Sequence, residues 1–208
     1  MNKLMIAVSI YLVLMFSGFI TYKLFFNQKE INIEQGQETL EILDNKLQNN
    51  HVHHEHNHED EAGYDYDEEM VKIFRDIEKT LSFFVSVIKE ENEQYFASMF
   101  LPEQLSKDLW NYSDNPHKEK AVLKLIKELN RDGKLVSAHY EENFIEEYKT
   151  TRLDSDIKIT LLYEDGKEAE LRLNLVLVGN EHSNENHIYF IENSVLELVE
   201  EVRKQTSQ

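Results

Sequence analysis

Cysteine is absent from this 208-residue chain, and several other residue types are scarce. The lack of cysteine excludes disulfide bridges, thiolate zinc sites, cysteine nucleophiles and lipid attachment through cysteine. Only six glycines occur, which disfavours phosphate sites built from glycine-rich backbone loops. Basic residues are also few, because 22 Lys and Arg stand against 40 Asp and Glu. Phosphate binding needs clustered cations, so we expect no nucleic acid partner.

The composition that remains permits a folded domain. Hydrophobic residues make up 41% of the chain and charged residues 30%, so a packed core can form beneath a polar surface. The length suits one ordinary domain with additional segments. Changes in composition divide the chain into residues 1–26, 27–67 and 68–208.

An uncharged apolar run, LMIAVSIYLVLMFSGFITY, covers residues 4–22 and is flanked by Lys3 and Lys23. As a helix it would span about 28 Å, close to the hydrocarbon thickness of a bilayer. A cleavable signal peptide is the alternative, but small residues are missing where a peptidase requires them. We therefore predict a transmembrane signal anchor within residues 1–26, with the lipid bilayer as its partner. The short N-terminal tail favours a single-pass cell-membrane protein whose C-terminal domain is extracytoplasmic.

Residues 27–67 are predicted to form a stalk and a linker. Leu40, Leu43 and Leu47 recur at helical spacing, over too short a stretch for a coiled coil. We interpret this part as a stalk that could self-associate. The following segment, HVHHEHNHEDEAGYDYDEE, is polar and acidic, and such a composition is typical of a flexible linker.

Five histidines are concentrated in the first ten residues of that linker: His51, His53, His54, His56 and His58. Neutral imidazole binds Zn²⁺, Cu²⁺ and Ni²⁺, and carboxylates can complete the coordination sphere. In composition the tract resembles the His-rich loops of bacterial zinc-uptake binding proteins and cation-efflux transporters. This resemblance implies an accessory metal collector, with zinc as the leading ion. Two alternatives are a solvated linker without a metal role, and a segment whose charge changes near pH 6.5.

From residue 68 onward, apolar residues spaced by three or four positions predict a series of helices. They are expected over residues 68–90, 92–100 and 102–110, and between Asn115-Pro116 and Asp132-Gly133. The period then changes to two, which predicts strands over residues 134–144, 157–163, 171–177 and 187–199. Asp165-Gly166 predicts a hairpin between the second and third of them. Helices followed by antiparallel strands indicate an α+β domain in which helices pack on one face of a curved antiparallel sheet.

This order of elements, the segment YFASMF at Tyr95–Phe100 and the long hairpin at Asp165-Gly166 resemble the NTF2-like superfamily. The resemblance covers residues 68–200 and implies a cone-shaped α+β fold. The superfamily includes extracytoplasmic accessory domains on single membrane anchors in Gram-positive bacteria. Its members range from enzymes to protein-binding modules, so the fold alone does not choose between them.

Enzymes of that superfamily place an ionisable side chain inside the cone, where burial shifts its pKa. The resemblance therefore implies four candidates: His139, Tyr140, His187 and Tyr189. Each also suits an ordinary position in a sheet. The chain contains no serine-hydrolase, zinc-protease or calcium-loop motif. Trp110, the sole tryptophan, is interpreted as a partial core residue in preference to a binding anchor.

The sequence thus leads to two main hypotheses of function. The first is a membrane-anchored extracytoplasmic protein without enzymatic activity, whose domain binds another protein or itself. The alternative is a transition-metal protein that collects Zn²⁺, Cu²⁺ or Ni²⁺ through the histidine tract. A small enzyme working inside the cone is a third possibility.

Overall fold

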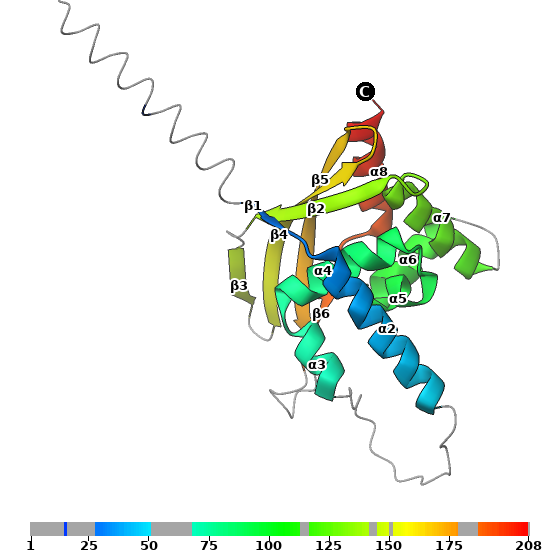
Figure 1. Cartoon of the computed structure of the whole chain (residues 1–208), viewed down its shortest axis with the longest axis vertical. Coiled ribbons are helices and arrows are strands. Elements are labelled where there is room, and N and C mark those ends of the chain that lie inside the picture. The colour runs from blue at the N-terminus through cyan, green and yellow to red at the C-terminus, as the bar shows by residue number, and fades with distance from the viewer. Residues whose placement is uncertain are drawn as a thin grey trace, which may run out of the picture.

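The computed structural model describes Met15 and residues 28–50, 68–112, 117–141, 145–149, 152–178 and 187–207. These residues form an α+β domain with helices gathered on one side of a six-stranded sheet (Figure 1). The strands are β1 Gln28–Glu30, β2 Leu135–Glu141, β3 Ile145–Lys149, β4 Arg152–Tyr163, β5 Glu168–Val178 and β6 Ile188–Ile191. The helices are α2 Ile33–Asn50, α3 Glu68–Phe74, α4 Ile77–Lys89, α5 Glu93–Ser98, α6 Pro102–Tyr112, α7 Lys118–Asn130 and α8 Val195–Thr206.

The sheet has the order β1-β2-β4-β5-β6, with β3 paired to the first half of β4, and every pair is antiparallel. Strand residues alternate between its two faces. On β4, Ile157, Ile159 and Leu161 are buried beneath the helices. On the opposite face, Lys158 Nζ lies 2.9 Å from Glu141 Oε1 and 2.6 Å from Glu170 Oε2. One face is therefore core and the other is polar, as the period of two predicts.

Helix α4 lies at the centre of the helical layer. Phe84, Val85 and Ile88 have no exposed surface, and apolar side chains surround the helix. We expected one continuous helix over residues 68–90, but the structure divides it into α3 and α4. Asp76 adopts an extended conformation between them, and its side chain accepts a hydrogen bond from the Lys79 backbone N–H. An aspartate that caps a helix in this way starts a new helix and ends the old one.

The segment Gln28–Asn50, here called the N-terminal arm, is part of the domain. Its strand β1 pairs with β2, and Ile31 N–H donates to the Ala138 carbonyl oxygen at 2.8 Å. Its helix α2 packs on α4 and buries Leu40 and Leu43. The prediction of a separate stalk is therefore wrong for these residues. The leucine spacing correctly indicated a helix, but its apolar face is covered by the domain itself.

Helix α8 replaces most of a strand that we expected over residues 187–199. Strand β6 ends at Ile191, and Ser194 then caps α8 by accepting a hydrogen bond from the Glu197 backbone N–H. The buried side chains of α8 follow helical spacing: Val195, Leu198, Val199, Val202 and Thr206. The hairpin prediction is confirmed, because β4 and β5 pair along ten registered positions on either side of Asp165-Gly166.

The expected fold class included a transmembrane helix, and the described helices do not contain one. No helix in the described ranges is long and apolar enough to cross a bilayer. The apolar run at residues 4–22 lies outside those ranges, apart from Met15. The fold class that the structure supports is an α+β domain with an antiparallel sheet.

Candidate functional site

The histidine tract, His51, His53, His54, His56 and His58, lies outside the described residues. Within the described ranges, no group of three or more His, Asp or Glu side chains is arranged to hold a metal ion. The expectation of a metal-binding site is corrected by this finding for that part of the chain.

The four candidates inside the sheet do not form one site. Tyr140 is buried on β2, and Tyr189 is buried on β6. Two strands separate β2 from β6, which places them about 14 Å apart across the sheet. His139 neighbours Tyr140 in sequence and therefore faces the opposite side of β2. His187 precedes β6 and is half-buried. The structure thus distributes these side chains and gives them no shared reacting centre.

Aromatic and lysine side chains instead come together where α6 meets α7. Trp110 is 75% exposed, the largest value among the exposed apolar side chains of the described residues. The interpretation of Trp110 as a partial core residue is therefore wrong. Lys118 Nζ lies 4.8 Å from the centre of the indole ring, within the range of a cation–π interaction. The same ammonium donates to the Leu109 carbonyl oxygen at 3.1 Å, which holds Lys118 beside the ring.

A second aromatic–lysine pair lies on the same two helices. Lys124 Nζ is 5.4 Å from the centre of the Tyr112 ring. The Tyr112 hydroxyl donates to Glu128 Oε1 at 3.3 Å, which links the end of α6 to α7. We call Trp110, Tyr112, Lys118 and Lys124 the aromatic–lysine patch. Cation–π pairs contribute about 0.5–1 kcal/mol at exposed sites, so they orient these side chains without burying them.

Helical geometry explains why the patch faces outward. On α6, Leu105 and Asp108 are buried. Trp110 stands about 200° beyond Asp108 around the helix, so it leaves the buried side. On α7 the buried residues form one stripe: Ala121, Val122, Leu125, Ile126 and Leu129. Lys124 falls outside that stripe and is exposed.

A buried carboxylate fixes α6 beneath the patch. Asp108 is 3% exposed and accepts hydrogen bonds from the Ser194 hydroxyl at 2.9 Å and the Val195 backbone N–H at 2.7 Å. The Gln104 side chain donates to it at 3.0 Å. The first backbone N–H groups of a helix lack partners within the helix. Asp108, which belongs to α6, accepts a hydrogen bond from one such group at the start of α8. Because it precedes Trp110 by two residues, it also gives the patch a rigid base.

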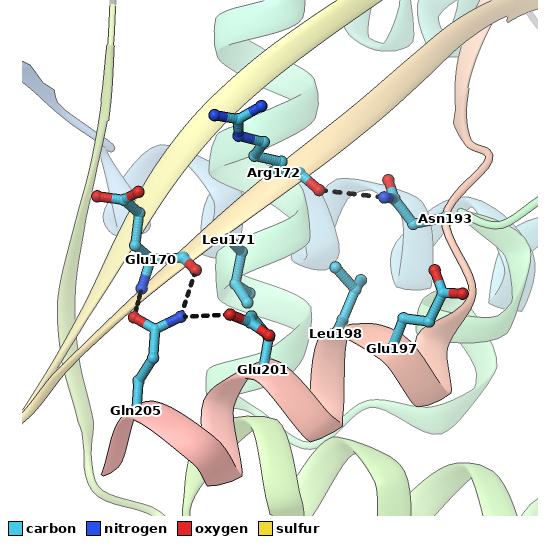
Figure 2. Close-up of a pocket in the computed structure, with 8 residues that line it drawn as sticks. All are labelled: Glu170, Leu171, Arg172, Asn193, Glu197, Leu198, Glu201 and Gln205. Carbon is cyan, nitrogen blue, oxygen red and sulfur yellow. Dashed lines mark hydrogen bonds between the residues drawn. The ribbon is translucent and has the colours of Figure 1, made fainter.

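A hollow of about 530 Å³ lies between β5 and α8, and Figure 2 shows the side chains that line it. The Gln205 carboxamide accepts from the Glu170 backbone N–H and donates to the Glu170 carbonyl oxygen, both at 2.8 Å. Asn193 donates to the Arg172 carbonyl oxygen at 3.1 Å and accepts from the Asn174 N–H at 2.6 Å. The side-chain amides of Gln205 and Asn193 thus form hydrogen bonds with backbone groups of β5 along the part of its edge that does not pair with β6. The hollow thus contains groups with structural roles.

Other ionisable groups with shifted pKa values hold elements together. Burial raises the pKa of the Tyr163 phenol, whose hydroxyl donates to the Leu129 carbonyl oxygen at 2.9 Å. Burial is the main cause that raises the pKa of Tyr95, and a hydrogen bond from its hydroxyl to Asp44 is the second. This hydrogen bond joins α5 to α2. The Arg131 guanidinium donates to Asp165 at 2.8 Å and lowers the pKa of that carboxyl group. Tyr163, Tyr95 and Asp165 all lie outside the lining of the hollow between β5 and α8.

Comparison with models of protein families, with curated proteins and with solved structures finds no match for this chain. The NTF2-like resemblance therefore gains no support from known proteins.

Proposed function

We propose that the domain is a protein-binding module and that the aromatic–lysine patch is its contact surface. The observation that supports this proposal is the exposure of Trp110 in a domain whose other large aromatic side chains are mostly buried. Tryptophan is enriched among the residues that dominate binding energy at protein interfaces. It offers a large contact area for the loss of only two side-chain torsions.

The energy available from this side chain is substantial. An aromatic side chain buries 150–250 Å² in a core or an interface, which at about 25 cal/mol per Å² amounts to on the order of 4 kcal/mol. Part of that energy offsets the loss of rotational and translational freedom on association. The rigid support from Asp108 reduces the further cost of ordering the surface. A single tryptophan on a fixed helix can therefore serve as the anchor of a modest interface.

Site-specific photocrosslinking tests the proposal in the full chain. A photoreactive phenylalanine analogue is placed at position 110 in cells that produce the protein, and at Val178 as the control. Val178 is 39% exposed on β5 and lies outside the patch. We expect a discrete crosslinked protein from position 110 and not from position 178. Identical products at both positions, or none at position 110, would refute the proposal.

Denaturation of the purified Trp110→Ala variant checks that the substitution leaves the fold intact. Because Trp110 is 75% exposed, we expect its free energy of unfolding to stay within about 0.5 kcal/mol of the parent value. Competition by the unlabelled parent protein should then remove the crosslink, whereas the Trp110→Ala protein should not compete.

A further inference from the structure

We infer that the segment bound by the aromatic–lysine patch is an acidic stretch of a partner protein; this inference rests on the proposed function. The first observation is the local reversal of charge. The whole chain has 22 basic against 40 acidic residues, whereas α7 has four lysines against two glutamates. Helix α7, which supplies both lysines of the patch, is therefore a cationic element on an anionic protein.

The second observation is the arrangement of those lysines. Lys120, Lys124 and Lys127 are exposed and recur at spacings of four and three residues. Such spacing aligns them along one side of the helix, opposite its buried stripe. The row measures about 10 Å from first to last. Within the described ranges neither Lys120 nor Lys124 forms an ion pair with a carboxylate, while Lys127 lies 3.8 Å from Glu91.

The spacing of the row fits carboxylates carried by a peptide. Lys120 and Lys124 are about 6 Å apart along the helix axis. Alternate residues of an extended strand are separated by about 6.6 Å, and they point to the same side. An acidic residue at every second position of an extended segment can therefore face successive lysines. Lys124, in the middle of the row, lies over the Tyr112 ring, so a segment along the row would reach the aromatic side chains at the end of α6, where Tyr112 follows Trp110 by two residues.

The net charge of the protein favours a short acidic peptide over nucleic acid. A formal charge of −18 repels a long polyanion that extends beyond the patch. At physiological ionic strength, charges more than about 8 Å apart are largely screened from one another. A short acidic segment thus responds mainly to the nearby lysines, whereas each phosphate outside the patch meets an acidic surface.

Fluorescence gives a direct test, because Trp110 is the sole tryptophan of the chain. The full-length protein is titrated with a decapeptide in which Glu and Leu alternate, and with its Gln-for-Glu counterpart. We expect a saturable change in Trp110 emission with the Glu peptide, weakening as salt is added, and at least tenfold weaker binding of the Gln peptide. Equal binding of the two peptides, or no saturable change with the Glu peptide, would overturn the inference.

Charge reversal locates the binding on α7. An exposed ion pair contributes 0.2–1 kcal/mol, which corresponds to a factor of about 1.4 to 5 in Kd. We therefore expect Lys120→Glu to weaken the Glu peptide about three- to tenfold, since it replaces attraction by repulsion. Lys204→Glu, an equal change of charge on α8, should alter Kd less than twofold. Equal effects of the two variants would refute the location.

Two further outcomes separate this inference from the proposed function. A single-stranded oligonucleotide of equal charge is expected to bind more weakly than the Glu peptide, and tighter binding would refute an acidic protein partner. If crosslinking from position 110 persists unchanged in the Lys120→Glu/Lys124→Glu protein, the binding module stands and the acidic partner is refuted. If crosslinking from position 110 is absent in the parent protein, the proposed function itself fails.

Discussion

Replacing Gly36 by alanine tests how the N-terminal arm is attached to the domain. Gly36 lies where α2 crosses α4. A Cβ atom at this position would stand 2.1 Å from the Ser82 carbonyl oxygen and 2.1 Å from Ser86 Oγ. Ser86 could rotate its hydroxyl away, but the Ser82 carbonyl belongs to the backbone of a buried helix. The two helices must therefore separate until that contact exceeds 3.0 Å.

Two opposing effects determine the change in stability. Alanine is favoured over glycine inside a helix by about 1 kcal/mol. Separation of the helices costs about 1–3 kcal/mol through overpacking. It also weakens the hydrogen bond from the Ser86 hydroxyl to the Ile33 carbonyl oxygen, now 2.7 Å, which contributes about 1 kcal/mol. We expect the free energy of unfolding of Gly36→Ala to fall by about 1–3 kcal/mol.

Urea denaturation of the full chain measures this change, with Glu38→Ala as the control. Glu38 is exposed on the same helix, so its substitution should alter the free energy of unfolding by less than about 0.5 kcal/mol. Hydrogen exchange of α2 should become faster in Gly36→Ala and not in Glu38→Ala. A stabilisation of about 1 kcal/mol in Gly36→Ala would mean that only helix propensity matters. That result would refute the packed arm.

Three other predictions concern side chains that join two elements. Asp108→Asn should lower the free energy of unfolding by about 2–4 kcal/mol, because an amide cannot accept all three hydrogen bonds of the carboxylate. The control is Glu103→Gln at an exposed position of the same helix, which should change the free energy of unfolding by less than about 0.5 kcal/mol. Equal values for the two variants in urea denaturation would contradict the role of Asp108. Gln205→Ala should lower it by about 1 kcal/mol and accelerate hydrogen exchange of the β5 edge amide beside it, and unchanged protection of that amide would exclude the carboxamide as its partner. Tyr163 has a raised pKa in the folded state, so its contribution is complete below the ordinary phenol pKa of 10.0 and is lost as pH rises above it. Tyr163→Phe should therefore make the free energy of unfolding fall less steeply above pH 10, and an unchanged slope would contradict this linkage.

The sequence predicted those parts of the fold that depend on local periodicity. The hairpin at Asp165-Gly166 is one example, because Gly166 has a φ of 75°, a conformation that glycine adopts without strain. Helix α8 also had a local signal that the interpretation missed. Ser194 and Glu197 have the spacing of a capping box, and the apolar residues after them follow a helical period. The strand predicted over residues 187–199 is therefore correct only for Ile188–Ile191.

Other features depend on contacts that no local pattern encodes. Gly36 looks like a weak point within a helix, and only the approach of Ser82 from α4 shows that its missing side chain is required. The leucines of α2 are compatible with a stalk or with a packed helix, since periodicity does not reveal what covers an apolar face. Trp110 is exposed, and not a partial core residue, because Asp108 occupies the buried side of α6. A polar residue that lies in the core shifts the buried face of α6 away from the tryptophan.

The docking of the N-terminal arm changes the meaning of the residues between α2 and α3. Positions 51–67, which include the histidine tract, join two helices that both pack on α4. Residues 50 and 68 thus both belong to one folded body, and the number of residues between them does not set the distance from residue 28 to the domain. For a flexible chain whose two ends are held, doubling the length costs only about 0.6 kcal/mol. A change in the number of residues between positions 50 and 68 should therefore leave the N-terminal arm where it packs on the domain.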